Sequence, residues 1–209
     1  AAAEKLAAAE GALVAQAARV VMAKGRAFHV DHVRLWVLLG AGLSDSYVVD
    51  GFVMTRGPEG VTKKIEGGCN VAVFPNGVDL EDTETKGTAL FTTASELGTY
   101  AKGQENMVKD LIDGLAAAGV NVIVSGASIG DLAMHYLDSH NILVIKSLSK
   151  FEIKRAATSV GAVPIAKVRA PTAKEMGHCD SVAMSEIGSQ KVTLFKVAVG
   201  KHSGISTIV

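Results

Sequence analysis

The chain has 209 residues, of which 48% are hydrophobic and 20% are charged, and its 21 Lys and Arg residues balance its 21 Asp and Glu residues. A chain of this length and apolar content can bury a sizeable core, so the disordered class of proteins is excluded. The balanced charge gives no net field that would attract nucleic acid or anionic lipid, and neither is predicted as a partner.

The sequence also indicates a compartment. Cys69 and Cys179 lack the paired spacing of a disulfide scaffold or a zinc site, which favours a reducing compartment, and we expect a cytoplasmic protein. Residues 1–24 are Ala-rich but carry charged side chains, so they predict an amphipathic helix, not a signal sequence, with Gly25 beyond its end. No apolar run reaches membrane length, and no membrane is expected as a partner. Because the first residue is not Met, we expect a part of a longer protein.

The next stretch of the chain predicts strands separated by loose segments. Residues 28–39 alternate apolar and polar side chains as a strand does, and the Gly/Ser stretch 40–44 that follows is a candidate hinge. Residues 47–54 and 70–74 predict two further strands with a turn-rich segment between them.

Residues 76–103 have a different character. They are polar and rich in glycine, and their few large apolar side chains show no core period. A long excursion with little packing of its own is typically functional or mobile. We therefore expect limited proteolysis to cut first between residues 82 and 103.

The centre of the fold is predicted between Met107 and Gly161. Apolar stripes at helical spacing predict three helices, and the β-branched runs 120–124 and 142–145 predict buried strands between them. Ser128 and Ser149 are predicted to start the second and third helix, and Gly161 is predicted to end the third. The side chains expected in the core are Met107, Val108, Leu111, Ile112, Leu115 and Ala118 of the first helix, Ile129, Leu132, Ala133, Tyr136 and Leu137 of the second, and Ile153, Ala156, Ala157 and Val160 of the third. Strands joined in this way lie side by side, so this region predicts a parallel α/β core.

Four more runs after the core predict strands, with turns at Gly188 and near residue 200. These runs are 162–168, 181–187, 191–199 and 204–209. The predicted fold class is therefore α/β, a parallel core that carries a mainly antiparallel β layer.

The turn in VIVSGASIGD is similar to the glycine-rich turn of dinucleotide-binding enzymes, in which a helix N-terminus meets phosphate. Only Gly126 and Gly130 of that pattern are present, which favours a tight strand-to-helix turn without a cofactor. An NAD(P)-dependent Rossmann-like oxidoreductase stays as the alternative function.

Two small clusters contain side chains that bind metals in other proteins: His29 with His32, and His178 with Cys179 and Asp180. Neither cluster supplies enough ligands at a workable spacing, so no metal site is predicted. Cys179 is a poor candidate nucleophile, because His178 would point to the other side of an extended strand. No catalytic residue is predicted.

Five segments of the chain together resemble a known family. They are DSYVVDGFVM (45–54), KIEGGCNVAVF (64–74), GVNVIVSGASIGDLAMHYL (119–137), SKFEIKRAATSVGA (149–162) and GHCDSVAMSEIG (177–188). In this order and at these separations they are similar to the apical region of group II (TCP-1 type) chaperonin subunits. DLEDTETKGT and MGHCDSV resemble the eukaryotic cytosolic branch in particular.

The resemblance, which covers nearly the whole chain, implies a domain organisation. Residues 46–203 would form a swivelling apical domain of chaperonin type, with a helical lid protrusion at about 82–105. Residues 1–45 would be part of the intermediate domain, and 204–209 a strand that returns to it. The implied function is that of a chaperone segment that binds unfolded client proteins and forms part of the built-in lid of an ATP-driven folding chamber. Its other implied partners are further subunits in a double ring.

In that family, ATP and Mg²⁺ bind to an equatorial domain through glycine- and aspartate-containing phosphate loops. This sequence does not match those loops, so we expect no cofactor within the segment and no ATP hydrolysis by it. A structural interaction domain without a client site is a third and plainer interpretation.

The family uses the helix that corresponds to 150–160, with a loop nearby, as a wall of the central cavity. A helical projection places four residues on its outward face: Phe151, Lys154, Arg155 and Thr158. We predict these as substrate-binding residues, in which the basic side chains steer acidic client segments and Phe151 supplies apolar contact. Two plainer interpretations stay open, since outward lysines are commonly just solvated and a first-turn phenylalanine can fold back onto the core. The loop 55–60 is the second candidate.

Overall fold

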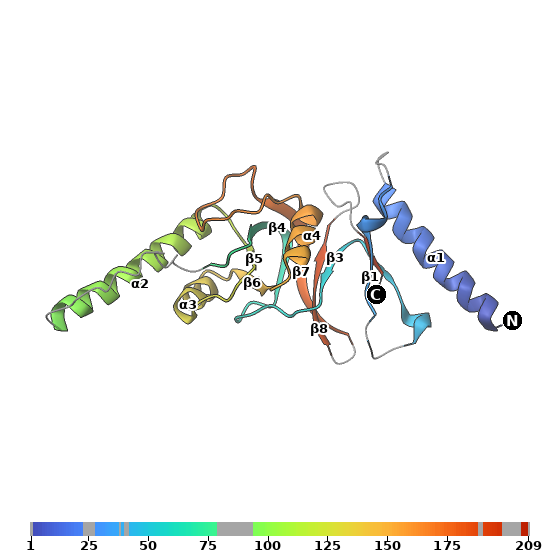
Figure 1. Cartoon of the computed structure of the whole chain (residues 1–209), viewed down its shortest axis with the longest axis horizontal. Coiled ribbons are helices and arrows are strands. Elements are labelled where there is room, and N and C mark those ends of the chain that lie inside the picture. The colour runs from blue at the N-terminus through green and yellow to red at the C-terminus, as the bar shows by residue number, and fades with distance from the viewer. Residues whose placement is uncertain are drawn as a thin grey trace.

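Two β-sheets organise the described part of the chain (Figure 1). The structure, a computed structural model, describes residues 2–22, 28–37, 39, 42–78, 94–187, 190–197 and 206–208. The helices are α1 (Ala2–Met22), α2 (Ala94–Ala117), α3 (Asp131–Ser139) and α4 (Lys150–Val160), with short 3-10 helices at Val30–His32 and Leu43–Asp45. The strands are β1 (Val33–Leu35), β2 (Val48–Val49), β3 (Gly51–Met54), β4 (Lys64–Phe74), β5 (Val122–Ser125), β6 (Leu143–Lys146), β7 (Gly177–Ile187), β8 (Gln190–Lys196) and β9 (Ser206–Ile208).

The larger sheet of the described residues has the strand order β3-β8-β7-β4-β5-β6. β4, β5 and β6 are parallel, and the connections between them contain α2 and α3. β7, β8 and β3 are antiparallel to their neighbours. β5 and β6 are short β-branched runs without an exposed residue, as strands covered on both faces must be. The predicted α/β class is confirmed, and the parallel and antiparallel strands join edge to edge in this one sheet.

Helices cover both faces of this sheet. Along β4 the side chains alternate: Val71 and Val73 pack in the core cluster of α4, whereas Ala72 and Phe74 pack in the cluster of α2 and α3. The buried stripe predicted for α4 is confirmed in full, with Ile153, Ala156, Ala157 and Val160 all in the core. Burying this stripe fixes which face of α4 is turned outward.

Two side chains predicted to be buried in α2 and α3 are exposed. Met107 is 63% exposed, because the buried side of α2 is centred on Val108 and Ile112 and position 107 lies about 100° around the helix from Val108. Leu132 is 41% exposed for the same reason, since it stands one position before the buried Ala133. The other predicted core positions of the two helices are buried or half-buried.

The larger sheet curls so that its two edge strands share one core. Phe52 of β3 and Ile145 of β6 belong to the same buried cluster as α4, although the strand order puts β3 and β6 at opposite edges. The segment 55–59 connects those edges: the backbone N–H of Glu59 donates to the carbonyl oxygen of Val144 in β6, 2.8 Å away. α4 therefore lies on the inside of the curve, beside this connecting segment.

The smaller sheet has the strand order β1-β9-β2, and α1 lies against β9. The single strand predicted over 47–54 is wrong, because the chain crosses there from one sheet to the other: β2 pairs with β9, and β3 pairs with β8. Gly51 makes this crossing with a φ of 142°. A Cβ atom at this position would lie 2.0 Å from the carbonyl oxygen of Phe195, so only glycine fits. The domain boundary after residue 45 stays a prediction.

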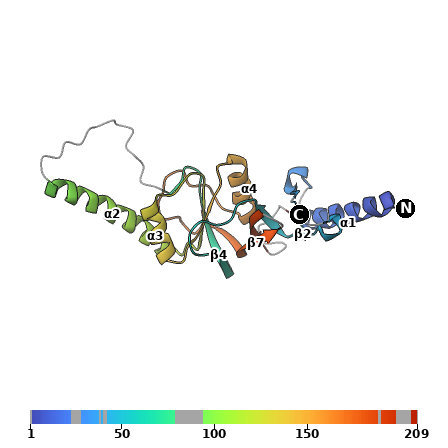
Figure 2. The same ribbon diagram turned by 90° about the horizontal axis from the view of Figure 1, so that it is seen from below.

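α2 begins at Ala94, and its first half extends away from the body of the fold (Figures 1 and 2). The irregular excursion predicted through residue 103 is therefore wrong for residues 94–103, which are helical. The described side chains from Tyr100 to Asn106 are mostly exposed, which explains why the sequence shows no core period here. The remainder of the predicted lid segment, residues 82–93, lies outside the described residues.

Three other predicted boundaries differ from the structure. The segment 28–39 contains one short strand, Val33–Leu35, and residues 40 and 41 of the predicted hinge lie outside the described residues. α3 begins at Asp131 with Gly130 as its N-cap, not at Ser128, because the chain is still turning after β5. At the C-terminal end, β8 stops at Lys196, before the predicted end of that strand, whereas β9 covers Ser206–Ile208 and residues 198–205 and 209 lie outside the described residues.

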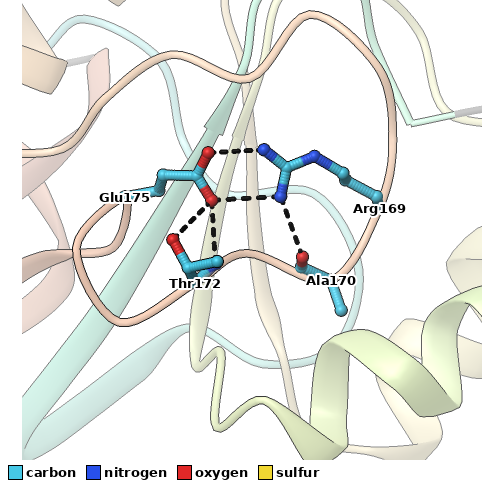
Figure 3. Close-up of polar contacts among 4 residues, drawn as sticks. All are labelled: Arg169, Ala170, Thr172 and Glu175. Carbon is cyan, nitrogen blue, oxygen red and sulfur yellow. Dashed lines mark hydrogen bonds and ion pairs between the residues drawn. The ribbon is translucent and has the colours of Figure 1, made fainter.

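The strand predicted over 162–168 is instead part of a loop that is held by one carboxylate (Figure 3). Both oxygens of Glu175 accept from the guanidinium of Arg169, and one also accepts from the backbone N–H and the hydroxyl of Thr172, at 2.9 and 2.7 Å. Arg169 also donates to the carbonyl of Ala170, 3.2 Å away. The bond from Arg169, followed by those from Thr172, lowers the pKa of Glu175 to about 2. Within the run itself, the backbone N–H groups of Val163 and Ile165 donate to the carbonyls of Glu175 and Val73, 3.0 and 2.9 Å away, so the run makes isolated backbone bonds and no β ladder.

Candidate functional site

The candidate site is the outward face of α4, and both ends of this helix are capped. The hydroxyl of Ser149 accepts from the backbone N–H of Glu152, 3.4 Å away. At the other end Gly161 takes the left-handed conformation, with a φ of 72°, and its N–H bonds back to the last turn. Both predicted caps are confirmed. Since the opposite side of the helix is in the core, the outward face has a fixed orientation.

The four predicted site residues all lie on this face, with different degrees of exposure. Phe151 is 72% exposed, so it does not fold back onto the core. Lys154 and Thr158 are exposed as well, whereas Arg155 is half-buried. The Thr158 hydroxyl donates to the carbonyl of Lys154, 2.9 Å away, so it is available to a ligand only as an acceptor. The structure thus places an aromatic ring one helical turn from two basic side chains.

Leu148 adds a second apolar side chain that the sequence reasoning missed. It lies immediately before the N-cap of α4 and is 63% exposed. A residue at that position commonly packs against the first turn of the helix as a hydrophobic staple, and that pattern would have predicted burial. Leu148 and Phe151 therefore give the N-terminal end of α4 two large exposed apolar side chains within four positions.

The rest of the face is basic. Lys150 and Lys154 are exposed, and the structure records no ion pair of Lys154 or Arg155 with another described residue. Charges that are free in this way are attracted to acidic segments, most strongly at low ionic strength. The face can therefore contact a flexible chain by apolar packing at one end and by charge attraction one turn further on.

One acidic side chain, that of Glu152, lies at the inner margin of this face and links it to its surroundings. One carboxylate oxygen accepts from the hydroxyl of Ser147, 2.5 Å away, and the other accepts from the hydroxyl of Thr55, 3.5 Å away. Ser147 follows β6 and Thr55 follows β3. We call Thr55, Ser147 and Glu152 the Glu152 junction.

The loop that starts at Thr55, the second candidate, is itself held by several bonds. The Arg56 carbonyl accepts from the Thr193 hydroxyl at 2.7 Å, and the Pro58 carbonyl accepts from the Lys63 ammonium at 3.0 Å. Further on, Gly60 lies so close to the carboxylate of Asp138 that an added Cβ atom would be 2.4 Å from it. The loop is therefore ordered beside the N-terminal end of α4, with the Arg56 side chain exposed.

The glycine-rich turn after β5 has a structural explanation. A Cβ atom on Gly126 would lie 1.9 Å from the carbonyl oxygen of Pro75, so glycine is required by the close approach of the protein's own backbone. The Ser125 hydroxyl donates to the carbonyl of Ala127, 2.7 Å away. These contacts account for the sequence of the turn without a bound phosphate.

The His and Cys clusters do not form a site either. Within the described ranges no three His, Cys, Asp or Glu side chains gather as metal ligands. Cys179 is buried while His178 is exposed, as expected for neighbours in a strand. Burial, and then the adjacent Cys69, raise the pKa of the Cys179 thiol, which keeps it protonated and unreactive. Among the described helices none is long and apolar enough to cross a bilayer.

Comparison with known proteins gives concordant matches. Residues 3–209 match the model of the TCP-1/cpn60 chaperonin family. The chain is 39% identical over 191 residues to T-complex protein 1 subunit theta of Dictyostelium discoideum, which covers 91% of this chain and 35% of that protein. It is 43% identical over 182 residues to the theta subunit of Arabidopsis thaliana, which covers 87% and 33%. The chain thus spans about a third of the length of these relatives.

A solved structure shows the same fold. The open-state monomer of a group II chaperonin from Methanococcoides burtonii superposes with a TM-score of 0.71 at 20% sequence identity, over 99% of this chain and 45% of that one. Since the identity is low, this likeness concerns the fold alone.

Proposed function

Because the chain belongs to the TCP-1/cpn60 chaperonin family, we propose that it is a segment of a chaperone subunit and that it captures unfolded client proteins on the outward face of α4. The observation that carries this proposal is the pair of large exposed side chains, Leu148 and Phe151, next to basic residues that form no ion pair with the described part of the chain, on a capped helix. An unfolded chain exposes apolar side chains that a folded protein buries, and such a surface can take them up.

The same proposal covers the organisation of the segment. Residues 46–203 act as the swivelling apical domain, residues 1–45 and 204–209 belong to an intermediate domain, and Gly51 lies where the chain crosses between the two sheets. The projecting first half of α2, with the segment before it from residue 82, forms part of a lid over a folding chamber. Its extension away from the body of the fold supports this assignment (Figure 2).

ATP, Mg²⁺ and the remaining partners belong to the longer protein in this proposal. ATP and Mg²⁺ bind to a different domain of the subunit, and related subunits assemble with it into a double ring in the cytoplasm. Neither the comparisons nor the geometry of the turn at Gly126 supports the alternative of an NAD(P)-dependent oxidoreductase.

The decisive experiment reverses the charge on the outward face. The double variant Lys154→Glu/Arg155→Glu should keep its fold, because neither side chain is on the buried stripe of α4. It should capture an acidic, chemically unfolded client more weakly than wild type, measured as slowed aggregation and by fluorescence anisotropy. The loss should be larger at 0.01 M salt, where the screening length is about 30 Å, than at 0.1 M, where it is about 10 Å.

A matched control separates a local effect from a change in net charge. Lys109→Glu/Lys174→Glu changes the net charge by the same amount at two exposed positions away from α4 and should leave capture unchanged. If the α4 variant is folded and captures the client as wild type does at low salt, α4 is not the site. Equal losses in both double variants would show that only net charge matters.

A further inference from the structure

We infer that Trp36 is a latch between the two sheets: its side chain packs on the larger sheet and must leave it before that sheet can swivel. The inference rests on the swivelling domain of the proposed function and adds to it the residue that restrains the motion. The latch involves no contact with a client, so it can be tested without one.

The first argument is that Trp36 belongs to the smaller sheet by its backbone and contacts the larger sheet with its side chain. Its backbone N–H donates to the carbonyl of Ile208, 2.9 Å away, which extends the pairing of β1 with β9 by one residue. Its side chain is half-buried against a core cluster of Val49 of β2, Val53 of β3 and Val192 of β8. Because β3 and β8 are strands of the larger sheet, the indole ring crosses the boundary between the sheets.

The second argument is where this contact lies relative to the crossing of the chain. Three other links between the sheets lie close to the crossing: Gly51 itself, the bond from the Val197 N–H to the Asp50 carbonyl at 3.2 Å, and the approach of β9 to β3. β1 is separated from β2 by β9, which at the usual strand spacing puts its backbone about 10 Å from β2. Links at a pivot fix its position, whereas a contact to one side of it also fixes the angle. A swivel about the crossing must therefore move Trp36 off its contact.

The third argument is that this contact can both hold and be released. An indole ring buries a large apolar area, which favours the packed position. The indole Nε1 atom is buried as well, but the described part of the chain gives it no hydrogen-bond partner. A buried donor without an acceptor reduces the gain from packing, and water would satisfy that donor once the ring is exposed. Apolar packing therefore closes the latch, and the unpaired N–H lowers the cost of opening it.

The neighbours of Trp36 along the chain provide matched controls. Leu35 and Val37 are 67% and 82% exposed, because side chains alternate along an extended segment and theirs point away from the cluster. Truncating either one changes the same segment of backbone and leaves the contact between the sheets intact.

The test measures the distance between the sheets in the 209-residue chain with two spin labels. Gln16→Cys on α1, which lies against β9, and His135→Cys on α3, which packs on the larger sheet, are exposed, whereas the native cysteines are buried. Without further changes, pulsed electron paramagnetic resonance should give one narrow distribution of distances. Trp36→Ala should make it about twofold wider or more, because the sheets then adopt a range of angles. Leu35→Ala and Val37→Ala should leave it narrow.

A second measurement does not depend on how well Trp36→Ala folds. Trp36 is the single tryptophan of the chain, so the fluorescence of the protein reports the surroundings of this side chain. Val192→Ala removes part of the surface that the ring contacts, and it should shift the emission to longer wavelength and raise quenching by acrylamide about twofold. Val124→Ala, an equally buried valine in the core cluster of α4, should change neither.

A conservative variant separates the apolar contact from a general loss of structure. Trp36→Phe keeps an aromatic ring and has no unpaired donor, so its distance distribution should be as narrow as that of wild type. The inference is overturned if Trp36→Ala keeps the wild-type distribution, or if Trp36→Phe widens it as much as Trp36→Ala does. Equal fluorescence changes in Val192→Ala and Val124→Ala would also overturn it. These outcomes are independent of client binding, so the charge reversal on α4 shows separately whether the proposed function fails.

Discussion

Truncating Ile153 and truncating Phe151, two residues apart on α4, should have opposite effects on stability and on client capture. Ile153 is 3% exposed in the core under α4, and a buried Ile→Ala change costs about 2–5 kcal/mol. For a chain of this size each kcal/mol lowers the unfolding midpoint by about 2–4 °C, so Ile153→Ala should unfold about 4–20 °C earlier than wild type. Phe151 is 72% exposed, and Phe151→Ala should cost about 0.5 kcal/mol or less, about 2 °C at most.

The assay for this pair is thermal unfolding followed by circular dichroism, together with client capture at a temperature where both variants are folded. Phe151→Ala should lose capture and keep its midpoint, whereas Ile153→Ala should lose stability and capture normally per folded molecule. An equal drop in midpoint for both variants would show that Phe151 packs on the core, and the assignment of the outward face would then be wrong.

Three further predictions concern other parts of the chain. Gly114→Ala, inside α2 with nothing within 4 Å of the added Cβ, should raise the free energy of unfolding by about 0.5–1 kcal/mol. Gly126→Ala should lower the free energy of unfolding, because it places a Cβ 1.9 Å from the carbonyl of Pro75. Urea titration measures both changes, and changes of the same sign would contradict the described turn. Arg169→Ala should lower the free energy of unfolding by its full amount above pH 4.5, the ordinary pKa of the carboxyl group, and by progressively less as the pH falls through about 2. The reason is that Arg169 stabilises the fold through Glu175 only while that carboxylate is ionised. A loss that persists at pH 2 in urea titrations would assign the effect to packing. The purified segment should release no phosphate from ATP, since its sequence matches no phosphate-binding loop, and turnover that survives removal of contaminating ATPases would refute this.

The features that the sequence predicts well are those set by short-range periodicity. The stripe of Ile153, Ala156, Ala157 and Val160 follows from helical spacing, and Ser149 and Gly161 follow from cap preferences that act within one turn. The outward position of Phe151, Lys154 and Thr158 is the geometric complement of that stripe. These parts of the candidate site could be predicted because all of their causes lie within about a dozen residues.

The features that the sequence does not predict depend on partners far along the chain. Glycine is required at position 51, where the strand breaks, by the carbonyl of Phe195. The first turns of α2 have no apolar stripe in the sequence from which a helix could have been predicted. The contact between Thr55 and Glu152 spans 97 positions, and it overrides a local capping rule. Leu148 was not among the predicted site residues because it precedes the helix whose outward face was projected, and a staple pattern would in any case have predicted its burial, whereas the side chain is exposed.

The segment 55–59 has a consequence for any protein that handles unfolded chains. An extended apolar polypeptide can pair with an unpaired edge strand of a sheet and extend the sheet, which leads to aggregation. At the outer edge of β6 the carbonyl of Val144 already accepts from Glu59, and the exposed half of β4 is kinked by Gly67 and Gly68, both with positive φ. If α4 captures clients, their main chains find these edges occupied or distorted. At these two places added strand hydrogen bonds are disfavoured, so a client on α4 is held there by its side chains.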